Sequence, residues 1–352
     1  MLVWCTGISG SGRKEYVKQA AEYCDTKGRR CTVIDVGDLL DEVPEYVKVG
    51  TTRTALLDGN EDVLRLHRLI ALQRLQQLVE EATEDDLIIV STHACFMRRA
   101  RFMSGLDMHF IKQSFSGKID VFATVIHDCH DIWIELQTRP EWANQLSLAE
   151  VAVWRDFETA STRMLAEYEG KPFYLLARRD PSSGIAQLAK VPTTPSLYLS
   201  YPITAIQKES PQLLEDAKAL AGGLRDAGFV VFDPLSIKDV PGTRKAAGTS
   251  EPAIPQELEL AAEPYLNSQT VARDFQLIDQ ADMVFVYYPT DKVSTGVHAE
   301  MSHARDRRKP LYLCAWPGAP ESVSPFLGLL YTEAFKTIDE AIPRLKELHF
   351  PT

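Results

Sequence analysis

Carboxylates flank a short apolar run in the last third of the chain, and they are the residues best suited to chemistry. The run Met283–Tyr288 is rich in residues that favour β-strands and is short for a helix, so it predicts a buried strand. Asp274 and Asp282 precede it, and Glu300 follows on a predicted helix. Because open α/β sheets bind ligands at the carboxyl ends of their strands, we expect a site here.

The start of that predicted helix joins an anion-binding pattern to a carboxylate. Ser294 and Gly296 lie in its first turn, where backbone N–H groups favour an anion, and Glu300 lies about one turn further in. A carboxylate beside a held anion is suited to nucleophilic attack on a substrate.

Residues 196 to about 316 resemble the nucleoside 2-deoxyribosyltransferase superfamily, and more closely its branch of nucleoside 5'-monophosphate N-glycosidases. Three patches carry the resemblance, and they are YLSYPI at 198–203, Asp274 with Ala281-Asp282, and STGVHAE at 294–300. The resemblance implies that Glu300 attacks the anomeric carbon, that Asp274 contacts sugar hydroxyls and that Tyr198 orients the nucleophile.

The same resemblance implies a phosphorylated substrate. Ser294, Gly296 and Ser200 would bind the substrate phosphate. Transferases that take free nucleosides usually carry an acidic residue at the position of Ser294, where it would repel a 5'-phosphate, whereas a hydroxyl can donate to it. The proton for the leaving base has three candidate sources: Asp282, His298 or a residue of the segment 239–268.

The resulting hypothesis is a nucleotide N-glycosidase that needs no cofactor. A carboxylate under the anomeric carbon stabilises oxocarbenium character or forms a glycosyl ester, which water then hydrolyses. Three alternatives stay open: a base-exchange transferase, a bifunctional nucleotide kinase and deoxyribosyltransferase, and a nucleotide-sensing regulatory protein without turnover.

The chain opens with a strand and a glycine-rich turn, which together outline a phosphate-binding loop. Gly7, Gly10 and Gly12 supply the turn, and Gly7 and Gly12 match the spacing GxxxxGK[ST]. Arg13 stands at the lysine position and Lys14 at the position of the Mg²⁺-binding hydroxyl. We expect nucleotide binding here, with ATP and Mg²⁺ as the candidate ligands, but little phosphoryl transfer.

The first 177 residues resemble the archaeal-type adenylate kinases, which are P-loop nucleoside monophosphate kinases. The matching pieces are TGISGSG at 6–12, VGDLLDEV at 36–43, THAC at 92–95 and Gly105-Leu106. By resemblance, Asp38 and Arg53 would lie near an acceptor monophosphate. Arg139 alone remains in a lid that carries several arginines in the family.

The composition of the chain limits the classes of ligand and partner that we expect. The formal net charge is -11 and no long basic run occurs, so we expect nucleotide small molecules as ligands rather than nucleic acid. The six cysteines include no CxxC, and no stretch is long and apolar enough to span a membrane. We expect a cytoplasmic homodimer or larger homo-oligomer, the oligomer by family resemblance. We expect no metal site, because the adjacent groups of His127–Asp131 should diverge.

Alternating strands and amphipathic segments predict two α/β domains with three-layer parallel sheets. A P-loop kinase-like domain would span 1–177, a linker 178–195, and a Rossmann-like (flavodoxin-like) deoxyribosyltransferase domain 196–352. The Pro-, Gly- and Ala-rich segment 239–268 would be an insertion that covers the site or packs on a partner subunit.

Overall fold

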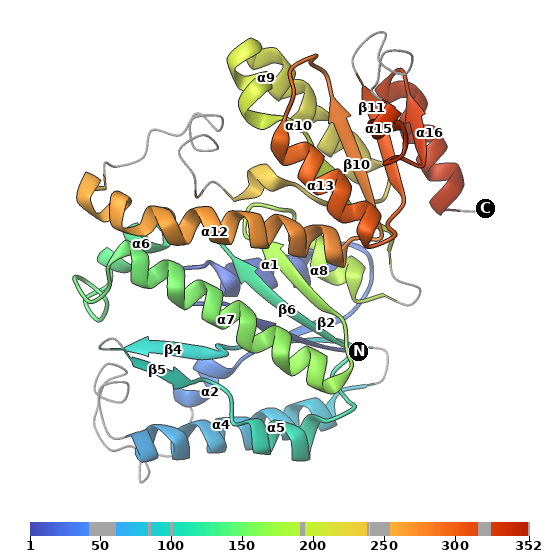
Figure 1. Cartoon of the computed structure of the whole chain (residues 1–352). Coiled ribbons are helices and arrows are strands. Elements are labelled where there is room, and N and C mark those ends of the chain that lie inside the picture. The colour runs from blue at the N-terminus through green and yellow to red at the C-terminus, as the bar shows by residue number, and fades with distance from the viewer. Residues whose placement is uncertain are drawn as a thin grey trace. The chain divides into compact units, whose positions relative to one another are not determined.

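The computed structural model describes residues 1–41, 61–83, 86–98, 101–190, 194–237, 239, 254–315 and 325–350 (Figure 1). The chain divides into two compact units. The first contains residues 1–189 and 254–265, and the second contains residues 190–253 and 266–352. Both units are α/β, and each is built on a five-stranded sheet whose strands pair in parallel.

The sheet of the first unit has the order β2-β3-β1-β6-β7, so β1 lies at its centre. Its strands are β1 Leu2–Thr6, β2 Cys31–Asp35, β3 Leu87–Ser91, β6 Val121–Ile126 and β7 Phe173–Ala177. β1, β3 and β6 are buried along their whole length, as continuous apolar runs in a parallel sheet require. The glycine-rich turn therefore follows the central strand.

Helices on both sides of this sheet complete the first unit. Because parallel crossovers are right-handed, the change of direction after β2 sends the following helices to the face opposite α1. Helices α4, α5 and α7 share a hydrophobic core with the sheet, while α1 packs with α8. The helices are α1 Arg13–Thr26, α2 Val36–Asp41, α4 Glu61–Glu81, α5 Met108–Phe115, α6 Cys129–Gln137, α7 Leu148–Glu169 and α8 Ser183–Leu188.

The sheet of the second unit has the order β12-β11-β10-β8-β9. Counted within the unit this is 2-1-3-4-5, the flavodoxin-like order, whose direction reverses between β8 and β10. Ligands of such sheets bind at the carboxyl ends of the strands that flank this reversal. The strands are β8 Ser196–Ser200, β9 Val230–Phe232, β10 Met283–Tyr288, β11 Leu311–Ala315 and β12 Glu333–Phe335.

Side chains along β8 and β10 point alternately to the two faces of this sheet, and one of these faces packs in a hydrophobic core. Leu197 and Leu199 of β8 join Met283 and Phe285 of β10 in the core that α10 and α16 cover. The intervening residues point the other way, toward α13. The helices of this unit are α9 Ile203–Glu209, α10 Pro211–Asp226, the short 3₁₀ turn Pro234–Ser236, α13 Thr295–Asp306, α15 Pro325–Gly328 and α16 Ile338–His349, with part of α12 Gln256–Gln280.

Three segments differ from the sequence-based expectation. The segment 178–195, predicted as a linker, contains α8, and the first unit extends to Ala189. The second half of the predicted insertion 239–268 begins the regular helix α12, and residues 240–253 lie outside the described residues. An unpredicted antiparallel hairpin forms from β4 Cys95–Arg98 and β5 Arg101–Ser104.

Within the described residues, no helix combines the length and the apolar character that crossing a membrane requires.

Candidate active site

Glu300 lies at the centre of a hydrogen-bonded group in the second unit. Tyr198 donates its hydroxyl to Oε1 of Glu300 at 3.0 Å, and Ser200 donates to Oε2. Both donors are fully buried, whereas Glu300 is half-buried. Each carboxylate oxygen is thus fixed by one hydroxyl, and the side chain keeps an exposed portion that a substrate can reach.

Strand periodicity explains why these two donors meet the glutamate. Tyr198 and Ser200 are two residues apart on β8, so both point to the face where α13 lies. They pair in register with Val284 and Val286 of β10, and α13 begins shortly after β10 ends. The short connection returns α13 over β8 and β10, which brings Glu300 above the two hydroxyls.

Asp274 reaches the same group from α12. Arg273 donates from Nε and Nη2 to Oδ1 of Asp274, at 2.9 and 2.8 Å, and its Nη1 lies 3.9 Å from Oδ2 of Asp239. The Asp274 side chain is 15% exposed and that of Asp239 is fully buried. Two buried carboxylates therefore share a single buried guanidinium, and Asp274 keeps one oxygen that Arg273 does not bind.

Burial favours the neutral forms of Glu300, Asp274 and Tyr198. Burial, together with the nearby charge of Asp274, raises the pKa of Glu300 to about 8, although the hydrogen bonds from Ser200 and Tyr198 and the charge of Arg273 oppose the rise. Burial also raises the pKa of Asp274 despite its pairing with Arg273. The phenol of Tyr198 has a raised pKa because of burial and both carboxylates, so it stays a hydrogen-bond donor.

The first turn of α13 is organised around Ser294. Its Oγ accepts from the backbone N–H of Val297 at 3.4 Å, and its own N–H donates to the hydroxyl of Tyr288 at 2.8 Å. Tyr288 in turn donates to the carbonyl of Lys292. The N–H groups of Thr295 and Gly296 have no acceptor within the helix, because these are its first two residues.

Two predicted site residues, Asp282 and Ser200, make hydrogen bonds within the protein. Asp282 precedes β10, so it lies at the amino edge of the sheet, where its Oδ2 accepts from the N–H and hydroxyl of Ser196 at 2.8 Å each. It is a structural link between β8 and β10 and does not join Glu300. Ser200 gives its one hydroxyl hydrogen to Glu300, so it has none left to donate to a phosphate.

His298, the other named candidate for protonating the leaving base, lies beside Tyr288, with ring centroids 6.3 Å apart. It comes two residues before Glu300 on α13, which places the two side chains on opposite sides of the helix.

The glycine-rich turn of the first unit is tightly packed. Gly10 and Gly12 have φ values of 81° and 70°, which residues with a side chain rarely adopt. A Cβ at Gly12 would lie 2.5 Å from Nε of Arg178, and one at Gly7 would lie 2.7 Å from the carbonyl oxygen of Val125. The glycines are therefore needed for the turn itself.

Arg13 points into the protein beneath this turn. Its Nε donates to Oγ of Ser91 at 2.9 Å, and Nη1 donates to the carbonyls of Gly7, at 2.6 Å, and Thr92. Its Nη2 lies 3.4 Å from Oδ2 of Asp35, and Arg13 is 4% exposed. The guanidinium thus bonds to the loop and to the segment after β3.

Lys14 forms ion pairs with two aspartates, Asp35 and Asp38. Nζ of Lys14 is 2.8 Å from Oδ1 of Asp35 and 2.7 Å from Oδ1 of Asp38. Burial would raise the pKa of Asp35, but Arg13, Lys14 and the hydroxyl of Ser91 together hold it below its ordinary value. Asp35 is therefore an anion with two cations beside it.

Arg53 and Arg139 were also predicted to contact a nucleotide. Arg53 lies outside the described residues. Arg139 is exposed and its Nη2 lies 2.8 Å from Oε1 of Glu135, one turn earlier.

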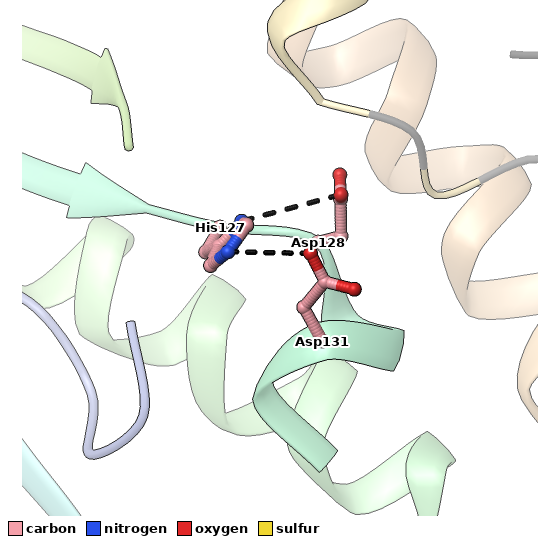
Figure 2. Close-up of side chains that lie close together, drawn as sticks. All are labelled: His127, Asp128 and Asp131. Carbon is pink, nitrogen blue, oxygen red and sulfur yellow. Dashed lines mark ion pairs between the residues drawn. The ribbon is translucent and has the colours of Figure 1, made fainter. Parts of the chain in front are cut away.

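Side chains after β6 form a second ionisable cluster. Ligand atoms of His127, Asp128 and Asp131 lie within 4.8 Å of one another (Figure 2), so the expected divergence of adjacent groups does not hold for these three. Nε2 of His127 is 3.3 Å from Oδ2 of Asp131, and Arg179 forms ion pairs with both aspartates. A single guanidinium thus pairs with both carboxylates.

Sequence reasoning missed Arg273 and Asp239. Arg273 directly precedes Asp274, and a basic residue next to a predicted site carboxylate was the only signal available. Asp239 is far from both in the sequence, and only the fold brings it to Arg273.

No protein-family model matches the chain, and no curated protein matches it. Among solved structures, a 2-deoxyribosyltransferase from Bacillus psychrosaccharolyticus aligns with 42% of this chain and 90% of its own, at 18% sequence identity and a TM-score of 0.30. A CMP N-glycosidase from Clostridium botulinum aligns with 43% of this chain and 98% of its own, at 16% identity and a TM-score of 0.25. At such TM-scores, a functional assignment must depend on the side chains.

Proposed function

We propose that the second unit cleaves the N-glycosidic bond of a nucleoside 5'-monophosphate, with Glu300 as the nucleophile. The observation that carries this proposal is the carboxylate of Glu300, held on both oxygens by Tyr198 and Ser200 and partly exposed at the sheet's direction reversal. A carboxylate fixed in this way needs no reorientation to attack a carbon.

In the proposed reaction, ionised Glu300 attacks the anomeric carbon while the bond to the base breaks. The electron pair of that bond leaves with the base, which takes up a proton from solvent, and a glycosyl ester forms on Glu300. Water then attacks the anomeric carbon of the ester, which gives the sugar a hydroxyl group, releases one proton to solvent and returns the free carboxylate. Tyr198 and Ser200 keep the attacking oxygens oriented. The free oxygen of Asp274 is placed to accept from a sugar hydroxyl, because Arg273 binds the other one.

The substrate phosphate would bind at the first turn of α13. The N–H groups of Thr295 and Gly296 point out of the helix start, where the helix dipole also favours an anion. Ser294 can add its hydroxyl hydrogen, since Oγ acts only as an acceptor toward Val297. A monophosphate fits this site better than an uncharged nucleoside.

The test is chromatography of the products formed from matched nucleosides and nucleoside 5'-monophosphates. We expect free base from at least one monophosphate, with a kcat/KM that exceeds that of its nucleoside by at least about tenfold. Failure to release base from any nucleotide would contradict the proposal. A second free base in the reaction separates hydrolysis from transfer, because only transfer gives a new nucleotide.

A further inference from the structure

The first unit has the outline of a phosphate-binding loop, and its resemblance to nucleotide kinases implies ATP with Mg²⁺. The residues present do not fit that ligand. We propose that Arg13 and Lys14 close the loop from within, so that this unit does not bind a nucleoside triphosphate–Mg²⁺ complex. The inference is independent of the chemistry proposed for the second unit.

Arg13 is already bonded where a phosphate-binding cation would have to be free. Of its five N–H groups, the one on Nε and both on Nη1 have oxygen acceptors, and Nη2 faces Asp35. To reach a phosphate on the outer side of the loop, the guanidinium would abandon the carbonyls of Gly7 and Thr92. Buried carbonyls without a donor are strongly disfavoured, so the inward position is the stable one.

Lys14 places an ammonium group where the loop pattern expects the Mg²⁺-binding hydroxyl. Its Nζ lies within 2.8 Å of carboxylate oxygens of both Asp35 and Asp38. Ammonium cannot ligate a metal, and its charge repels a divalent cation from these oxygens. The carboxylates that would attract Mg²⁺ are therefore already paired with the protein's own cations, Arg13 and Lys14.

The loop also has an internal support that makes a ligand unnecessary for its shape. The fully buried carboxylate of Glu158 accepts from the N–H of Gly7 at 2.9 Å through Oε1. The same carboxylate accepts from the N–H groups of Ala94 and Cys95, at 2.8 and 2.7 Å. Glu158 thus ties the start of the loop to the segment after β3, as Arg13 does.

The direct test is calorimetric titration of the full chain with ATP, with and without Mg²⁺. Binding of ATP that requires Mg²⁺ would indicate the glycine-rich loop of the first unit, whereas binding that does not require Mg²⁺ would indicate an anion site in the second unit. We expect no Mg²⁺-dependent binding of ATP up to about 1 mM, which corresponds to about 4 kcal/mol of binding free energy. Mg²⁺-dependent binding with a Kd below about 1 mM would overturn the proposal.

A gain-of-binding variant provides the second arm. The double substitution Arg13→Lys with Lys14→Thr restores the spacing of the loop pattern, and we expect it to bind ATP at least about tenfold more tightly with Mg²⁺ than without it. Lys18→Thr, an exposed change on the same helix, is the control and should leave the chain unresponsive. A folded double variant without the gain would show that these two side chains do not close the loop.

Discussion

The two units treat charge in opposite ways at the carboxyl ends of their central strands. In the first unit, Arg13 and Lys14 are paired with Asp35, and little charge is left for a ligand. In the second unit, Asp274 and Asp239 share Arg273, and Glu300 has only hydroxyl partners, so its pKa rises to about 8. The charge of Glu300 is thus less compensated than that of Asp274 or Asp35.

The pairing of charges in the two units distinguishes a structural motif from a candidate catalytic group. A familiar motif whose cationic side chains are already paired within the protein behaves as structure, because each hydrogen bond that they make to a ligand would cost an existing one. A carboxylate with a strongly shifted pKa in an accessible place is more informative, since functional groups are commonly tuned in this way. The less familiar half of the chain is therefore the better candidate for catalysis.

Adding charge at the start of α13 should have a large effect on a phosphorylated substrate. In Ser294→Asp, a carboxylate about 5 Å from the substrate phosphate would cost about 3 kcal/mol at an effective dielectric constant of about 20, or about 100-fold in kcat/KM. The nucleoside without phosphate serves as the control and should change less than about threefold. Equal losses for both substrates would place the phosphate elsewhere.

Removing one donor from Glu300 should have a smaller effect. Tyr198→Phe deletes the hydrogen bond to Oε1, and we expect kcat to fall by about tenfold to thirtyfold, the equivalent of about 1.5–2 kcal/mol. Because that bond lowers the pKa of Glu300, its loss should also shift the rate profile to higher pH. A profile that stays in place would separate Tyr198 from the nucleophile.

The rate of the unmodified protein should itself depend on pH. Only ionised Glu300 attacks, and its pKa is about 8, so kcat/KM should rise about tenfold per unit below pH 8 and level off above it. The same shift favours the protonated native state, so this group lowers the free energy of unfolding as pH rises from about 4.5 to 8. A rate that is flat between pH 6 and 8 would exclude Glu300 as the titrating group.

The smallest expected effect on the rate is that of Asp282→Asn. Asp282 links β10 to Ser196 at the edge opposite Glu300, so kcat should stay within about twofold, while the free energy of unfolding falls by about 1–3 kcal/mol. Urea unfolding and base release measured on the same preparation check both parts. A large loss of kcat in a stable variant would return Asp282 to the site.

Much of the fold follows from local sequence signals. β10 has the bounds that its short apolar run predicts, because a buried parallel strand needs an uninterrupted apolar stretch. Helix α12 was missed, since Pro264 and the alanines and polar residues before it look like an irregular insertion. Its stability comes from packing, which sequence periodicity does not report.

The candidate site was only partly predictable. Tyr198, Asp274 and Glu300 were recognised through a family pattern, whereas the roles of Ser200 and Arg273 depend on which atom meets which oxygen. Asp282 directly precedes β10 in the sequence, which places it at the amino edge of the sheet and away from Glu300, although the family pattern named it as a site residue.

The central claim is that Glu300 performs the chemistry, and the most direct measurement is the rate of base release by Glu300→Gln. Asp306→Asn, an exposed carboxylate change at the end of the same helix, is the matched control. We expect a loss of at least about 1,000-fold in kcat for Glu300→Gln, with a melting temperature no lower than that of the unmodified protein, because an amide carries no buried charge. Base release by Glu300→Gln at the rate of the control would contradict this claim.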